Sequence, residues 1–412
     1  MKLPRYSVSP DNPDFFNNPY PYYGQMRSLG SAVYWEDYDK IAFCDFAPVN
    51  TILRDRRFGR EITHLISREQ AGLEPIPDHL ATLYEFESRS MLEREPPAHT
   101  RLRGLVNKAF VSRNIQKMRG RIETLSHALI DEFEGRHETD LLPAYAEKIP
   151  IIVICEILGV PVSVSDQLLE WSHKMVAMYQ FNRDRLIEDN AIAAMNSFSA
   201  FIRDYADERR KSPGDDLISL LIEATEDGDR LTNDELITTC ILLLNAGHEA
   251  TVHGMGNAIK ALIENEVNVA EVFADDQSAN AAADELLRYN PPLHLFSRYV
   301  LEDLEFDGIK LSRGQSVALL LGAANHDPKR YKTPDKLDFN RGGAGHLAFG
   351  AGIHFCLGAP LARLEMAVAL KVLFDRLPGL KISERPGYRD QYHFHGLKRL
   401  LVNWQEEEIG SG

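Results

Sequence analysis

The chain has 412 residues, of which 44% are hydrophobic and 26% charged, an ordinary globular composition with enough material to enclose a bulky ligand. Lys and Arg number 46 against 61 for Asp and Glu, and the net charge of -15 argues against a nucleic-acid partner. The sequence shows no apolar signal core near its start and no apolar run that could span a bilayer. We therefore expect a cytoplasmic protein without a membrane partner.

Helices are expected to dominate the first two thirds of the chain. Residues 1 to about 90 mix proline-rich loops with short apolar runs, and helical periodicity follows from about 97 to 290. Pro96 and Pro97 precede a predicted helix, because proline suits a first helical turn. The clearest helix opens at Thr232, where Thr232 and Glu235 form a capping box, and it runs for about 30 residues, or roughly 45–50 Å.

Short extended segments after Pro291 and Pro292 predict a small sheet. A loop-rich stretch at 325–355 then leads into a helix near Leu357, and the last segment returns to strands. The pattern predicts a mainly α fold with a small β region, in a single domain over residues 1–412. Its β-rich parts are expected at about 1–60, 292–340 and 380–412, and its helical parts at about 90–290 and 357–378.

The four cysteines stand far apart, at positions 44, 155, 240 and 356, without any CxxC pair. This spacing excludes an iron-sulfur cluster and a zinc ribbon. It fits a reducing compartment in which at most one cysteine carries out chemistry.

Cys356 lies in the richest motif of the sequence, FGAGIHFCLGAPLAR at residues 349–363. Its glycines allow the backbone to approach a flat ring and to turn N–H groups toward the sulfur. A helix directly after the cysteine adds the positive end of its dipole, which stabilises a thiolate. A lone cysteine is usually an inert buried residue, and the surrounding loop is what favours chemistry at Cys356.

This loop resembles the heme-binding loop of the cytochromes P450 at Phe349, Gly350, Gly352, His354, Cys356, Gly358, Leu361, Ala362 and Arg363. The resemblance covers nearly the whole chain in the family's order. It implies the cytochrome P450 fold, with heme b between the long oxygen-binding helix and the helix that follows the cysteine loop. Cys356 would then be the axial ligand of the iron, and Phe349, Gly350 and Gly358 would surround the cofactor and shield the ligand.

Two further motifs resemble conserved parts of that family. Glu285 and Arg288 lie one helical turn apart and match its ExxR pair, and Arg341 matches the arginine that completes this structural triad. Taken alone, such a pair is usually solvated. The resemblance implies that the triad supports the cysteine loop.

His99 and Arg103 also lie one turn apart, so both can reach the same anion. The resemblance makes them ligands of the heme propionates, together with Arg298 and His354. Any one of these four residues in isolation would be read as a surface cation.

The long predicted helix carries NAGHEAT at residues 245–251, in which Ala246, Gly247, Ala250 and Gly254 form a patch of small residues. It resembles the family's oxygen-activation segment, with Glu249 as the acid. The usual hydroxyl residue is replaced by Ala250, and Thr251 stands one position late, about 100° round the helix. The hypothesis is a proton relay of Glu249, water and either Thr251 or a substrate hydroxyl.

His248, Glu249 and His253 differ from a zinc-protease HExxH motif, because the spacing is HExxxH. The second histidine falls about 140° round the helix from the first. These three residues therefore form no metal clamp of that kind.

The resemblance implies a reaction that inserts one atom of dioxygen into a C–H bond of the substrate and releases the other as water. We expect a monomer that takes electrons from a separate ferredoxin-type protein. That protein would dock at Lys108, Arg113 and Lys117. In the alternative interpretation, these three residues are only a solvated basic face without a partner. The functional alternatives are a peroxide-driven peroxygenase and a non-catalytic heme-binding sensor.

The expected substrate is a small apolar organic molecule of moderate size. Its contacts are predicted by position in the family, although a residue of this kind is more often plain core than a ligand contact. They are Leu83, Phe86, Met178, Phe181, Leu243, Leu293, His294, Leu295, Phe296 and Phe394.

Overall fold

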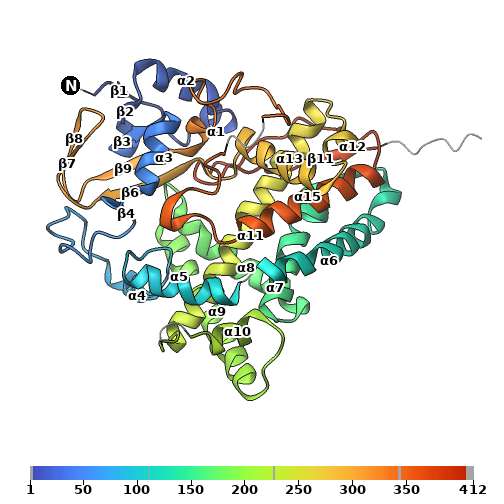
Figure 1. Cartoon of the computed structure of the whole chain (residues 1–412), viewed down its shortest axis with the longest axis horizontal. Coiled ribbons are helices and arrows are strands. Elements are labelled where there is room, and N and C mark those ends of the chain that lie inside the picture. The colour runs from blue at the N-terminus through green and yellow to red at the C-terminus, as the bar shows by residue number, and fades with distance from the viewer. Residues whose placement is uncertain (1–2, 111, 226–227, 342–344, 405–412) are drawn as a thin grey trace, which may run out of the picture.

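The structure is a computed structural model that describes residues 3–110, 112–225, 228–341 and 345–404, without the side chains of residues 112–114 and 116. Helices dominate the described residues and the strands are short, as the sequence predicts (Figure 1). The helices are α1 (Pro13–Asn17), α2 (Tyr20–Leu29), α3 (Phe46–Arg54), α4 (Ala81–Glu87), α5 (Ala98–Ala109), α6 (Ser112–Asp131), α7 (Lys148–Leu158), α8 (Ser165–Val176), α9 (Arg185–Lys211), α10 (Leu217–Glu223), α11 (Asn233–Glu264), α12 (Val269–Val272), α13 (Asp276–Tyr289), α14 (Leu321–Ala324) and α15 (Ala359–Arg376).

The strands form three small sheets. The largest has the order β1-β2-β3-β9-β6-β4, from β1 (Arg5–Tyr6), β2 (Ala32–Trp35), β3 (Lys40–Phe43), β9 (Ser316–Leu320), β6 (Leu295–Val300) and β4 (Phe58–Gly59). Parallel pairing of β3 with β9 therefore joins the first two of the three predicted β-rich parts of the chain. The other sheets are β10-β11-β5, from β10 (Lys381–Ile382), β11 (Leu401–Asn403) and β5 (Glu138–Asp140), and the hairpin of β7 (Leu304–Phe306) with β8 (Ile309–Leu311).

Helix α11 runs through the middle of the molecule, with the six-stranded sheet to one side of it (Figure 1). Its start is fixed by a capping box in which Thr232 and Glu235 each accept a bond from the other's backbone N–H. Most of its 32 residues are buried, which explains why its apolar residues are not confined to one narrow stripe.

Helix α15 packs against α6 and α13 in the largest apolar cluster, while α7 and α9 cover α11. Separate clusters lie on the two faces of the six-stranded sheet. The apolar faces of these elements therefore bring the loop before α15 close to α5 and α13. None of the described helices is long and apolar enough to cross a membrane.

Candidate active site

The cysteine loop is shaped by two glycines in left-handed conformation. Gly350 has φ 68° and Gly352 has φ 71°. A Cβ on Gly352 would lie 2.1 Å from the Leu53 carbonyl oxygen, so only glycine allows the loop to sit on the end of α3. The Cys356 N–H closes the loop by donating to the Phe349 carbonyl at 3.0 Å. Gly358 then caps α15 next to the sulfur.

Cys356 is the exposed member of the four cysteines, while Cys44, Cys155 and Cys240 are buried. Burial raises the pKa of each of these three thiols to about 12, so they are inert. The surrounding protein also raises the pKa of Cys356. The N–H groups of Gly358 and Ala359 and the charge of Arg103 oppose that rise. Cys356 thus combines access with groups that favour a thiolate.

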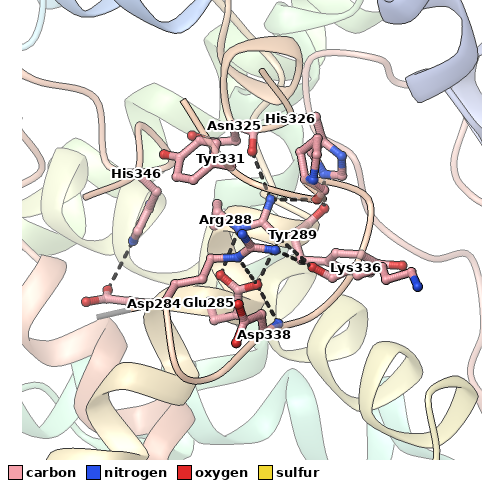
Figure 2. Close-up of polar contacts among 12 residues, drawn as sticks. Asp284, Glu285, Arg288, Tyr289, Asn325, His326, Tyr331, Lys336, Asp338 and His346 are labelled. Atoms are coloured by element: carbon pink, nitrogen blue, oxygen red, sulfur yellow. Dashed lines mark hydrogen bonds and ion pairs between the residues drawn. The ribbon is translucent and has the colours of Figure 1, made fainter. Parts of the chain in front are cut away.

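Asp284 holds the two ends of the cysteine loop together. Its Oδ1 accepts a bond from Arg363 at 2.6 Å and lies 3.0 Å from the ring of His346, a pair drawn in Figure 2. Arg363 also lies over the ring of Phe349, 4.7 Å from its centroid. The Phe349 carbonyl accepts the Cys356 N–H, so the two residues are neighbours, and shielding of the ligand by the Phe349 ring stays a prediction.

Behind the loop, Glu285 and Arg288 form a buried bidentate pair, with bonds of 2.7 and 2.9 Å (Figure 2). The guanidinium also donates to the backbone carbonyls of Asn325, Pro334 and Lys336. All five of its N–H donors are thereby used. The pair fastens α13 to the loop-rich stretch before the cysteine.

Arg341 joins this pair by donating from Nε to Glu285 at 3.0 Å and from its other nitrogens to the carbonyls of Lys332, Thr333 and Lys336. The Asp338 N–H donates to the same carboxylate (Figure 2). The predicted triad is therefore assembled as one network, and its bonds end mostly on loop carbonyls.

The predicted propionate ligands converge near the cysteine loop. The rings of His99 and His354 lie 4.4 Å apart, and Arg103 is close enough to affect the pKa values of both His99 and Cys356. Burial, followed by the charges of His354 and Arg103, lowers the pKa of His99 to about 4. Burial, followed by the charge of Arg60, lowers the pKa of Arg298 to about 9.

Glu95, directly before α5, is the carboxylate within this cationic group. It lies 3.1 Å from the His354 ring and accepts the N–H of Arg60. In the described part of the structure, neither Arg103 nor Arg298 has an ion pair, and Arg298 donates to the carbonyl of Ser297. Cationic groups thus outnumber their counter-charges here, which suits a further anion.

The small residues of α11 interrupt its burial. Ala246 is exposed and Gly247 and Ala250 are half-buried, whereas the residues from 251 to 259 are buried without a break. Thr251 is buried, and its hydroxyl donates to the Gly247 carbonyl at 2.9 Å. The accessible surface of this helix is therefore a strip of small side chains that could admit a planar group.

Glu249 points to α8, where its Oε1 lies 3.0 Å from Nε2 of His173. Its other oxygen lies 3.4 Å from Nε2 of His253. Burial is the largest single influence and raises the pKa of Glu249, but the hydrogen bond with His173 and the charges of His173, His253 and His248 together hold the pKa below its ordinary value. Glu249 is thus a carboxylate at neutral pH, with an exposed histidine as its partner.

The predicted substrate contacts fall into separate groups. Leu83, Phe86 and Met178 pack around one small apolar cluster, and Phe86 also touches the cluster that contains Leu243. Leu293 and Phe394 pair through a β-bridge, and the ring of Phe394 lies 6.1 Å from that of His253 on α11. Phe296 lies against Gly350 of the cysteine loop.

Three other predicted contacts lie elsewhere. The buried ring of His294 is 2.7 Å from the hydroxyl of Tyr23. Leu295 belongs to the core cluster of Phe15 and Trp35. The Phe181 side chain is 45% exposed and lies beside Tyr38. These three residues therefore belong to none of the groups that the other seven predicted contacts form.

Of the predicted docking residues, Lys108 donates to the carbonyl of Thr225 at 3.0 Å and Lys117 is exposed. The side chain of Arg113 lies outside the described residues.

Sequence reasoning missed three residues of the site: Glu95, Asp284 and His173. Glu95 and Asp284 stand next to recognised motifs, directly before Pro96 and Glu285. This adjacency in sequence was the one feature that could have identified them as site residues. His173 lies in an ordinary amphipathic helix and meets Glu249 only through the packing of α8 on α11.

The assembled residues fit a heme. Nδ1 of His99 is buried without a hydrogen-bond partner and lies in a group of cations that suits carboxylates. Cys356 offers an accessible sulfur beside backbone N–H groups, and α11 offers an accessible strip of small residues. These are the ligand, the anion partners and the flat face that the cofactor requires.

The comparisons with known proteins agree with this geometry. The sequence profile described as Cytochrome P450 matches residues 65–275 and 277–378. The chain is 32% identical to "Polyketide biosynthesis cytochrome P450 PksS" of Bacillus subtilis, over 96% of this chain and 98% of the relative. It is 34% identical to "Vitamin D(3) 25-hydroxylase" of Pseudonocardia autotrophica, over 94% of each. The crystal structure of P450BioI with hexadec-9Z-enoic acid ligated acyl carrier protein matches with a TM-score of 0.88 and 30% identity, over 95% of this chain and 100% of that chain.

Proposed function

Because the chain belongs to the cytochrome P450 family and is a monooxygenase of that family, we propose that its cofactor is heme b and its substrate a small apolar molecule. We further propose that a separate ferredoxin-type protein supplies its electrons. The single observation that carries this proposal is Cys356, the exposed cysteine of the four, whose sulfur lies beside the N–H groups of Gly358 and Ala359 and the charge of Arg103.

When bound, the heme supplies the activation of dioxygen and the oxidising chemistry. The chain's own residues bind and orient it. Cys356 provides the thiolate ligand, and the Glu285–Arg288–Arg341 network fixes the loop that presents it. His99, Arg103, Arg298 and His354 would bind its propionates, and the small side chains at Ala246 and Gly247 would leave room for a planar group beside α11.

Proton delivery depends on groups other than a helix hydroxyl. Ala250 has no proton to give, and the hydroxyl of Thr251 donates to Gly247 instead. Glu249 lies 3.0 Å from His173, whose side chain is 42% exposed, so this pair connects the site with solvent. We propose that water or a substrate hydroxyl completes the path. The Ala250→Thr enzyme would then gain coupling with substrates that carry no hydroxyl; unchanged rate and coupling with every substrate would remove this explanation.

The substrate class is tested by a library screen for displacement of the heme's water ligand, read from the Soret band. The names of the relatives direct its contents: vitamin D(3), polyketides, and hexadec-9Z-enoic acid both free and linked to an acyl carrier protein. Apolar compounds of moderate size are expected to give the largest shifts. Shifts from charged, hydrophilic compounds alone would contradict the proposal.

The electron donor is tested at Lys117, which is exposed. Lys117→Glu is expected to slow reduction by a surrogate ferredoxin and to change its salt dependence, because charge pairing accelerates encounter. Lys211→Glu, on the distant end of α9, serves as the control. Equal reduction kinetics in the two variants would remove Lys117 from the docking surface.

Turnover measurements distinguish the monooxygenase from the two alternative functions, a peroxide-driven peroxygenase and a heme-binding sensor. Product formed with a ferredoxin system and little formed with peroxide alone supports the monooxygenase; the reverse supports a peroxygenase. Tight ligand binding without product under either condition supports a heme-binding sensor.

A further inference from the structure

A second group of potential ligands lies outside the cysteine loop, between α8 and α11. It consists of His173, His248 and Glu249, which we call the His–His–Glu cluster. One ligand atom from each lies within 4.8 Å of the other two, and the rings of His173 and His248 are 5.9 Å apart. No other group of three such ligands was found in the described part of the chain. A zinc ion bound at about 2.1 Å places its ligands about 3.4 Å apart, so small side-chain rotations would close this cluster.

The cluster contains a buried histidine whose ring nitrogens are poorly satisfied. His248 is 1% exposed, and neither ring nitrogen makes a hydrogen bond of ordinary geometry with the described residues, although the Glu147 backbone lies close enough to influence the ring. Burying an imidazole in this way is unfavourable, and a metal ion would satisfy one of its nitrogens.

The neighbours of the cluster suit a metal ion. Nε2 of His253, which is also buried, lies 3.4 Å from the second oxygen of Glu249 and can orient the carboxylate. The side chain of His173 is 42% exposed, which gives an ion a route from solvent and leaves room for water. The chain's net charge of -15 favours the approach of cations.

The donor set selects the class of metal. Two imidazoles and one carboxylate are typical ligands of zinc and its neighbours, whereas magnesium and calcium prefer oxygen ligands throughout. We propose that His173, His248 and Glu249 bind one divalent transition-metal ion of the zinc class, with water completing its coordination. The proposed site differs from the HExxxH motif of α11, because its second histidine is His173 on α8 and not His253 on α11 itself.

The experiment uses the untagged, heme-loaded full chain after treatment with EDTA. Zinc chloride is titrated by calorimetry, and bound zinc is counted per chain by elemental analysis. One zinc per chain is expected, with affinity at least tenfold weaker in His173→Ala and in His248→Ala. His79→Ala is the matched control, because His79 also pairs with a carboxylate, Glu188 at 2.7 Å, and should bind zinc as the wild type does. The proposal would be overturned if the wild type bound zinc no more tightly than His173→Ala and His248→Ala do.

Crystals of the wild type soaked in zinc keep the test valid if a variant fails to fold. An anomalous peak at the zinc edge is expected between the three ligand atoms. A peak elsewhere, or none, would contradict the site.

One consequence rests on the proposed function. An ion on Glu249 would remove the carboxylate from proton exchange, so zinc is expected to lower the fraction of electrons that end in product. Binding and crystallography do not depend on turnover. An inactive enzyme would therefore count against the proposed function and leave the metal site testable, whereas absent zinc binding would count against the metal site alone.

Discussion

Arg288 shows how much of the site depends on the shape of one side chain. It is 2% exposed, and its guanidinium makes two bonds to Glu285 and three to backbone carbonyls. An ammonium group has three donors and no planar fork, so it would leave loop carbonyls and part of the carboxylate unsatisfied. The charge of this residue alone does not explain its role.

The Arg288→Lys variant is therefore expected to lose about 1–3 kcal/mol of unfolding free energy for each buried acceptor that it leaves unsatisfied. Its heme content should fall as well, because the loop before Cys356 loses its support. Denaturant unfolding and the heme-to-protein ratio measure the two effects. Arg185→Lys, in the exposed pair with Asp189, is the control and should change stability by less than about 0.5 kcal/mol. Equal stability of the two variants would contradict the structural role.

At the same scale, sequence reasoning located the residues of the motifs but not their counter-charges. Cys356, Glu285, Arg288 and His99 stand in recognisable patterns, and the structure assembles the pairs among them. Glu95 reaches His354 across 259 positions of sequence. Neither local spacing nor composition encodes such a contact, which depends on how the loop before α5 docks against the cysteine loop.

At the scale of elements, the cysteine loop depends on its contact with α3. The Gly352→Ala variant adds left-handed strain and a clash with the Leu53 carbonyl. Gly379→Ala is the control, because Gly379 also has a positive φ but has open space where its Cβ would lie. This variant therefore measures the backbone strain alone, about 1–2 kcal/mol of unfolding free energy. We expect Gly352→Ala to lose a further 1–3 kcal/mol and to bind heme poorly. Matching unfolding curves and heme content in the two variants would show that the contact with α3 is unimportant.

Helix α15 carries a buried carboxyl group, Glu365, whose pKa burial raises from 4.5 to about 8. The folded chain therefore keeps a proton that the unfolded chain releases. Unfolding free energy then falls as pH rises from 4.5 to about 8, and at pH 7 the loss is about 3 kcal/mol.

Glu365→Gln removes this titration. It is expected to be more stable than the wild type at pH 7 and to show a flatter dependence between pH 5 and 8. Denaturant unfolding of the heme-loaded protein at pH 5, 6, 7 and 8 provides the comparison. Parallel stability curves for the two proteins would show that Glu365 does not titrate in this window.

Element boundaries were predictable where local chemistry sets them. The capping box of Thr232 and Glu235 fixed the start of α11, and the diproline marked the start of α5. The strand order was not predictable, because β3 pairs with β9 across more than 270 positions of sequence. Such pairing reflects the packing of whole apolar faces, and the strands themselves carry only a weak local pattern.

At the scale of the whole molecule, helices and loops distant in sequence place a single accessible sulfur near a group of cations and an exposed strip of α11. The other three cysteines are buried and unreactive, so the chemistry of the chain is concentrated at Cys356. The family assignment implies a thiolate ligand for a heme, and we propose Cys356 for that role. The account therefore depends most on the thiolate ligation of the heme.

The most direct test is the absorption spectrum of the reduced carbon-monoxide complex of the heme-loaded protein. The wild type is predicted to show the strongly red-shifted Soret band of a thiolate-ligated heme, and Cys356→His is predicted to lose that shift while retaining heme. Cys240→Ser, which alters a buried cysteine, should keep it. An unshifted band in the intact wild type, or a shifted band in Cys356→His, would contradict the account.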